Sequence, residues 1–249
     1  ASNIIGQFIG LITLIFQKFK TLFSSVASIS KNEIVETTKE YKDFPRVNTF
    51  HALLDAFREA AIIYMIFNFY GNNTLGLYAF TIRLMKIPLG MIGTSIGQVF
   101  FQKATEIKNH QQSLYKLTLG TIKKLILISL PIFILIGLLS GWAFELVFGD
   151  KWVTAGYLAQ IFAPWMFFHF LNSPLSQIPM IINKQKEVFL ISIIGFILGL
   201  ASLFVGGVLF EEAIYGLSLF SVTQSIYLFF VILWTLRIAR KFDQQVKES

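Results

Sequence analysis

Four polar side chains share one face of an otherwise apolar segment, and their types are suited to binding an anion or carrying a proton. Segment 47–70 contains neither Pro nor Gly and is long enough to cross a bilayer. At 3.6 residues per turn, spacings of i, i+4, i+7 and i+8 place these residues on one face: His51, Asp55, Arg58 and Glu59. A membrane helix tolerates such a stripe only where it faces protein or water. The segment is therefore predicted to form one wall of a polar cavity.

Two further cations lie in the next apolar segment, 75–101. Arg83 and Lys86 are spaced i, i+3. Pro88, which lies two residues after Lys86, is expected to break the helix. Counted from the starts of their segments at 1.5 Å per residue, Arg58 and Lys86 both lie about 16 Å deep. A charge near the bilayer centre costs roughly 2.5 to 3.5 kcal/mol, so three such cations require a reason to persist.

An anionic ligand would supply that reason. The carboxylates of Asp55 and Glu59 offset two of the three cations, so one positive charge remains in excess. The candidate substrate-binding residues are Arg58, Arg83, Lys86 and His51. Asp55 and Glu59 are candidates for coupling to H+ or Na+, the only cofactor considered. In the alternative interpretation, the same two carboxylates neutralise Arg58 in a purely structural ion pair.

Segment 157–182 is interrupted by proline and carries polar residues beside the expected breaks. Broken helices in transporters line cavities or act as hinges. The candidate hinge or cavity residues here and in segment 75–101 are Pro88, Pro164, Pro174, Asn172 and Gln177. His169 lies in the aromatic context WMFFHF and is interpreted as a packing or interfacial residue rather than a proton relay.

Composition places the chain among integral membrane proteins. Of 249 residues, 55% are hydrophobic and only 14% are charged, against about 25% in a soluble domain. The absence of cysteine excludes thiol catalysis, disulfides and cysteine-based metal sites, and no metal site is predicted. The net charge of +7 is explained by membrane topology, so no nucleic-acid partner is expected.

The apolar segments alternate with joints of unequal charge. Seven segments are found: 3–16, 47–70, 75–101, 122–139, 157–182, 188–210 and 213–236. One set of joints, 17–46, 102–121 together with Lys123 and Lys124, 183–187 and 237–249, holds 17 of the 21 Lys and Arg. The other set, 71–74, 140–156 and 211–212, holds only Lys151. By the positive-inside rule the first set is cytoplasmic.

These segments predict an all-α, polytopic transmembrane bundle of six complete spanning helices plus one truncated N-terminal helix. The first segment reaches only about 21 Å, short of a hydrocarbon core of about 30 Å, which suggests that the chain starts within a helix of a longer protein. The predicted division is a truncated helix at 1–17, a cytoplasmic linker at 18–46, a six-helix bundle at 47–241 and a cytoplasmic tail at 242–249.

Several sequence elements in fixed order resemble one family of membrane proteins. They are YKDFP at 41–45, VFGDKWVTAGYLAQIFAPW at 147–165, SPLS at 173–176, and a spaced pattern at Gly76, Tyr78, Arg83, Pro88, Ile92, Gly93 and 97–101. In this order they look like the C-terminal half of bacterial oligosaccharide (O-antigen/polysaccharide) flippases, members of the MOP (MATE-like) exporter superfamily.

The resemblance implies a non-enzymatic transporter of the bacterial cytoplasmic membrane with two six-helix bundles. Its implied cargo is a polyprenyl-pyrophosphate-linked oligosaccharide, flipped by alternating access for lipopolysaccharide or other surface polysaccharide. The implied partners are that lipid-linked sugar, membrane lipids and the N-terminal half of the parent protein. Arg58, Arg83 and Lys86 would then bind the pyrophosphate.

Three alternatives are compared with this function. A drug or cation exporter of the same superfamily should line its cavity with net acidic residues, which the excess of positive charge disfavours. A membrane-embedded sugar transferase or polymerase needs external loops larger than the predicted joints 71–74, 140–156 and 211–212. A non-transporting membrane fragment is the third alternative.

Overall fold

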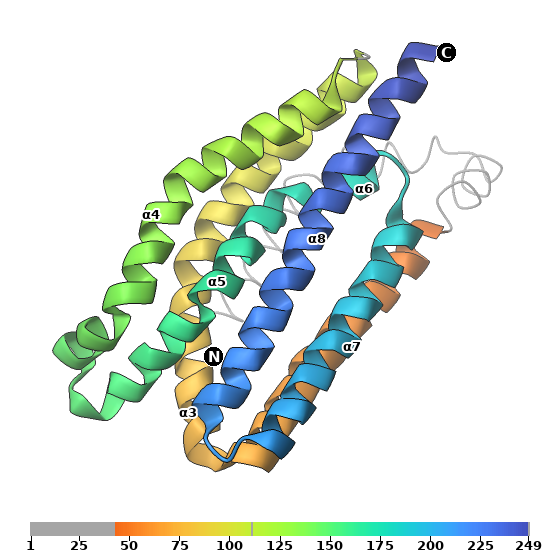
Figure 1. Ribbon diagram of the computed structural model, residues 1–249. Helices are drawn as coiled ribbons and strands as arrows, with labels where there is room; N and C mark the ends of the chain where they lie inside the picture. Colours follow the sequence, from red (N-terminus) through yellow and green to blue (C-terminus); the bar gives the residue numbers. More distant parts are fainter. Residues whose placement is uncertain (1–42, 111, 249) are drawn as a thin grey trace, which may run out of the picture. The chain divides into compact units, whose positions relative to one another are not determined.

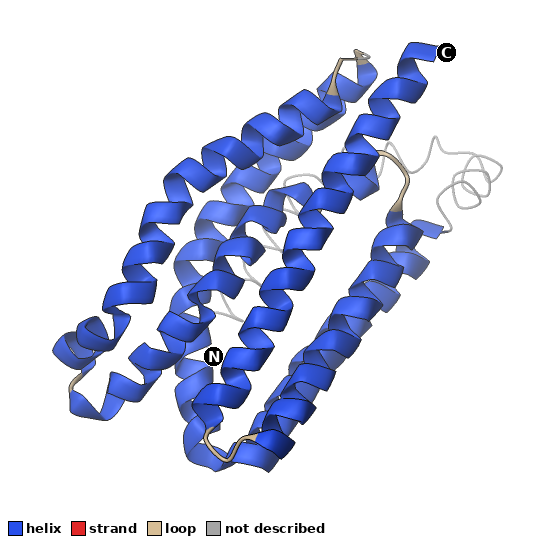
Figure 2. Ribbon diagram, in the orientation of Figure 1, coloured by secondary structure: helices blue, strands red, loops and turns tan. Residues whose placement is uncertain are grey.

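The computed structural model describes residues 43–110 and 112–248, in which helices are joined by short loops and turns and no strand is found (Figures 1 and 2). The elements are α3 (Asp43–Asn109), α4 (Leu114–Phe148), the 3-10 helix η1 (Asp150–Trp152), α5 (Val153–Leu175), α6 (Ile178–Ile181), α7 (Gln185–Leu209) and α8 (Ala213–Glu248). The chain divides into two units, Ala1–Phe50 and His51–Ser249, and only the second is described below. The predicted truncated helix 1–17 and nearly all of the predicted linker 18–46 lie outside the described residues.

Helix α3 consists of two halves that run in opposite directions, 51–70 and 72–109 (Figure 1). The reversal occurs at Gly71, whose φ of 77° and ψ of 179° are accessible only to glycine. Segments 47–70 and 75–101 were predicted as separate helices, and this turn falls in the predicted joint 71–74. The first half packs against α7, where the Phe57 and Phe196 rings are 5.7 Å apart. The second half packs against α5, where Tyr78 and Phe162 are also 5.7 Å apart.

By length and composition, four stretches among the described helices are candidate membrane spans, rather than the six predicted. They are Ala52–Asn109, Leu114–Phe148, Gln185–Leu209 and Ala213–Val246. The first contains both predicted segments 47–70 and 75–101, because the two halves of α3 follow each other directly at the reversal at Gly71. Helix α5 is not among the four, since Gln160, Pro164 and His169 lower its hydropathy. Large apolar side chains such as Leu127 and Leu138 are 77% and 69% exposed, which is typical of a surface that contacts lipid.

Two prolines that were expected to break helices do not. Helix α3 continues through Pro88, and α5 continues through Pro164. A proline removes one N–H donor, and in membrane helices local adjustments and neighbouring groups compensate for that loss. The predicted interruption of segment 157–182 occurs later, where residues 176–177 separate Leu175 at the end of α5 from the short α6.

The end of α4 that was predicted from hydropathy is also wrong. Segment 122–139 was predicted to end at a joint covering 140–156, but the helix extends to Phe148. The residue that ends it is Gly149, whose φ of 88° lies in the left-handed region. A fall in hydropathy ended the predicted segment, whereas a backbone conformation ends the helix. Likewise, α8 continues to Glu248 through the predicted tail 242–249.

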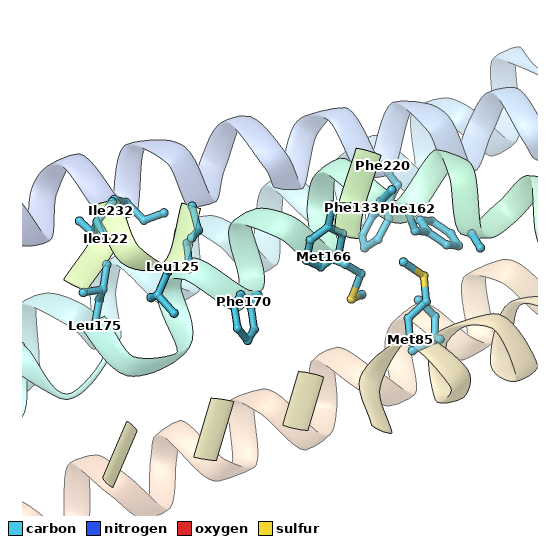
Figure 3. Packing of buried hydrophobic residues seen from close by; sticks show 14 of the residues in the cluster. Met85, Ile122, Leu125, Phe133, Phe162, Met166, Phe170, Leu175, Phe220 and Ile232 are labelled. Atoms are coloured by element: carbon cyan, nitrogen blue, oxygen red, sulfur yellow. The ribbon is translucent and has the colours of Figure 1, made fainter. Parts of the chain in front are cut away.

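The core of the bundle is centred on α5, which packs against α4 and α8. Its most buried side chains include Phe162 and Met166, each 0% exposed, and Phe220 of α8 at 1% (Figure 3). Helix α8 also packs against α7. There the backbones approach so closely that a Cβ on Gly206 would lie 2.8 Å from Gly216 Cα. These contacts fix the rotation of each helix and therefore decide which polar side chains meet.

Candidate functional site

A polar cavity of about 280 Å³ lies between both halves of α3 and helices α5, α7 and α8. Aromatic and aliphatic side chains, including Trp165, Phe196 and Phe220, form much of its wall. The polar side chains that line it are Asp55, Arg58, Glu59, Tyr78, Lys86, His169, Gln224 and Tyr227. Four of the six charged or titratable residues predicted for substrate or ion coupling therefore line a single cavity.

An ion pair connects the two halves of α3 across this cavity. Lys86 Nζ lies 3.5 Å from Glu59 Oε1, although the two residues are 27 positions apart. The equal depths inferred for Arg58 and Lys86 are consistent with this contact, since Glu59 follows Arg58 directly. The Lys86 and Glu59 side chains are 50% and 71% exposed, so protein does not enclose the pair and both groups remain accessible.

Arg58 is held more tightly, against α7. Its Nη2 donates a hydrogen bond of 2.9 Å to the carbonyl oxygen of Ser192, and its Nη1 lies 3.5 Å from Asp55 Oδ1. The Arg58 side chain is 31% exposed. Its Nε is buried and has no hydrogen-bond partner among the described residues. The guanidinium is therefore fixed in orientation while one donor remains unsatisfied.

The opposite wall contains residues that the sequence interpretation missed. Gln224 Nε2 donates to the carbonyl oxygen of Gly195 over 3.0 Å, and the Tyr227 hydroxyl donates to the carbonyl oxygen of Ile191 over 3.1 Å. Gln224 could have been found, because an amide inside the apolar segment 213–236 is unusual. His169, interpreted from the sequence as a packing or interfacial residue, is exposed and also lines this cavity.

The charges lining the cavity are balanced, with two carboxylates from Asp55 and Glu59 facing the two cations of Arg58 and Lys86. Arg83 is exposed and does not line the cavity. Residues three apart on a helix differ by about 60° in direction, and here that difference separates Arg83 from Lys86. The expected excess of positive charge is therefore outside the cavity.

The remaining candidate residues lie elsewhere or are not described. The His51 side chain is outside the described residues. Pro88 lines a separate, apolar pocket between α3, α4 and α5. Pro164 is exposed, Pro174 is buried, and Gln177 lies in the turn between α5 and α6. Asn172 is half-buried, and its Oδ1 has no hydrogen-bond partner among the described residues. None of the proposed hinge residues lines the polar cavity.

Comparison with known families identifies the chain. The family described as "Polysaccharide biosynthesis protein" matches residues 4–157, which include Arg58, Glu59 and Lys86. No curated protein and no solved structure matches the chain. The matched range covers more than half of the chain. The chain therefore belongs to the polysaccharide biosynthesis protein family, which is part of the polysaccharide flippase (MOP) group and is transporter-like and generally non-enzymatic.

Proposed function

We propose that this protein forms part of a flippase that moves polyprenyl-pyrophosphate-linked oligosaccharide across the cytoplasmic membrane by alternating access. Family membership supports a role in polysaccharide biosynthesis. The observation that carries the proposal is the meeting of Arg58 and Lys86 in one polar cavity enclosed by apolar helices. A lipid-linked sugar needs such a cavity for its charged head group, while its prenyl tail remains in lipid.

The ion pairs in the cavity are suited to exchanging partners with a phosphate group. Both N···O distances, from Arg58 to Asp55 and from Lys86 to Glu59, are 3.5 Å. Strong charge-assisted hydrogen bonds measure about 2.7 to 2.9 Å, so these pairs are loose. Pyrophosphate oxygens that displaced the carboxylates would gain shorter contacts with both cations. Asp55 and Glu59, once displaced, are the proposed acceptors of H+ or Na+.

We further propose that six helical segments cross the bilayer: the two halves of α3, then α4, α5, α7 and α8. Successive segments run in opposite directions in Figure 1. Their joints alternate between rich and poor in Lys and Arg, which supports a cytoplasmic C-terminus and a turn at Gly71 outside the cytoplasm. In this orientation α5 spans despite its lower hydropathy, because it packs against both α4 and α8 within the bundle.

A drug exporter of the same superfamily is the rival function. The expected excess of positive charge disfavoured organic cations as cargo, but the cavity charges are balanced. The preference for an anionic sugar lipid therefore rests on the family and on the loose ion pairs. Arg83, exposed on the same helix, is the remaining unbalanced cation in the predicted set.

Complementation by the full-length protein in a strain that lacks its flippase tests the proposal. Arg58→Gln and Lys86→Gln should each lower surface polysaccharide by roughly tenfold or more, because each removes one head-group contact. Lipid-linked oligosaccharide should accumulate in the membrane at the same time. Lys124→Gln is the matched control, since Lys124 is exposed on α4 and does not line the cavity. Normal surface polysaccharide in both cavity variants, at normal protein levels, would refute the proposal.

A further inference from the structure

A second cavity, of about 430 Å³, lies at the opposite end of α8 from its first turn. Its walls come from α8, from the connection between α6 and α7 and from the first turn of α7, and Figure 1 shows α6 beside the C-terminal part of α8. On α8 the lining residues recur at helical spacing and form one face: Trp234, Arg237, Ile238, Lys241, Phe242 and Gln245. The apolar segment 213–236 ends here, so the cavity lies where the helix leaves the apolar environment.

The cavity has an excess of positive charge. Its lining includes Arg237, Lys241 and Lys184 and a single acid, Glu187. Lys184 forms an ion pair with Glu187, whereas Arg237 and Lys241 are exposed and form no ion pair with the described residues. The acid nearest to them on α8, Asp243, is already engaged, because it accepts hydrogen bonds from the Ser113 hydroxyl and from backbone N–H groups of α4.

Beneath these cations the cavity is apolar. Ile238 is 7% exposed, and Ile182 and Phe242 are half-buried. Trp234 is half-buried one turn before Arg237, at the level where tryptophan is typically found at a membrane surface. A soluble anion needs only the cations. An amphipathic anion also contacts the apolar floor of the cavity, which is formed by Ile182, Ile238 and Phe242.

We propose that this cavity binds the head group of an anionic phospholipid. Arg237 and Lys241 contact the phosphate, and the apolar floor contacts the glycerol and the first part of the acyl chains. A zwitterionic lipid carries no net charge and gains less from the two cations. The site is distinct from the polar cavity between the halves of α3, because no residue lines both.

The chain offers a closely matched control. Arg240 lies on the same helix and Lys116 on α4, next to the residues that Asp243 contacts. Both are exposed, and neither lines the cavity. The double variant Lys116→Gln/Arg240→Gln therefore removes one Lys and one Arg from the same end of the bundle, as Arg237→Gln/Lys241→Gln does, but leaves the cavity intact.

Native mass spectrometry of the delipidated full-length protein in detergent tests the site. Dioleoylphosphatidylglycerol should form a first adduct that is roughly tenfold or more weaker in Arg237→Gln/Lys241→Gln, and about twofold weaker or less in the control variant. Dioleoylphosphatidylcholine should bind all forms equally and weakly. An excess of inorganic phosphate should not displace phosphatidylglycerol, because phosphate cannot use the apolar floor.

Three results would overturn the proposal. Equal losses of phosphatidylglycerol affinity in the two double variants would show that binding depends on diffuse surface charge and not on a defined site. Displacement by inorganic phosphate would show a site for small anions. Equal affinity of the unchanged protein for phosphatidylglycerol and phosphatidylcholine would show that the cavity does not select lipids by their charge. Because all measurements are of binding, their outcome does not depend on whether the protein transports a sugar lipid.

Discussion

At the scale of single residues, Arg58 and Arg83 show that similar charges at similar depth have different roles. Arg58 connects α3 to α7 through the Ser192 carbonyl oxygen and contacts Asp55. Arg83 is exposed and has no hydrogen bond or ion pair with the described residues. Of these two arginines, only Arg58 combines a contact between helices with a position in the polar cavity.

Arg58→Met should therefore lower the free energy of unfolding by about 1 to 3 kcal/mol. The substitution keeps much of the side-chain length but removes a charge-assisted hydrogen bond between two helices. The unfolding midpoint of the purified full-length protein in detergent measures the effect. Arg83→Met is the control and should change stability by no more than about 0.5 kcal/mol. Equal shifts in the two variants would contradict the assigned contact.

At the scale of helices, close backbone contact and polar ties between ends hold the bundle together. Lys108 at the end of α3 donates a hydrogen bond of 2.7 Å to the carbonyl oxygen of Ile181 in α6. Asp243 near the end of α8 contacts the start of α4, where Leu114 N donates to Asp243 Oδ1 over 2.8 Å. A carboxylate at a helix N-terminus satisfies free N–H groups and interacts favourably with the helix dipole. These ties connect helices that are distant in sequence.

The contact between α7 and α8 has no room for an added methyl group at Gly206. Gly206→Ala should lower the free energy of unfolding by about 1 to 3 kcal/mol, because its Cβ would lie 2.8 Å from Gly216 Cα and force the helices apart. Thermal unfolding in detergent measures this loss. Gly120→Ala in α4 is the comparison, since a Cβ there meets no atom within 4 Å. That variant should gain about 0.5 to 1 kcal/mol from the lower entropy of the unfolded chain. Tolerance of alanine at Gly206 would show that the helices are packed less closely.

At the scale of the whole molecule, the alternation of joints that are rich and poor in Lys and Arg sets the proposed orientation. Asn73, in the turn after Gly71, and Asn109, at the end of α3, are exposed at opposite ends of the second half of α3. Their different accessibility from outside the cell is therefore a direct test of the proposed topology.

Single cysteines at these two positions should differ in labelling. In the full-length protein freed of any other cysteine, Asn73→Cys should react with a membrane-impermeant maleimide in intact cells. Asn109→Cys should react only after the cells are permeabilised, because the basic joint 102–121 is proposed to be cytoplasmic. The present chain contributes no cysteine of its own. The reverse pattern would overturn the orientation, and labelling of both positions would show that the second half of α3 does not span.

The sequence by itself determined the helical class, the membrane environment, the turn between two apolar segments at 71–74 and the presence of charges deep within them. These features are local, since hydropathy and the cost of a buried charge can be read residue by residue. Only the tertiary structure decided that Glu59 meets Lys86, that Arg58 contacts Ser192, and that His169, Gln224 and Tyr227 complete the cavity while Arg83 lies outside it. It also decided that the helices continue through Pro88 and Pro164. The reason is that such contacts depend on the rotation of each helix about its axis, which is set by close packing between residues distant in sequence, as at Gly206 and Gly216.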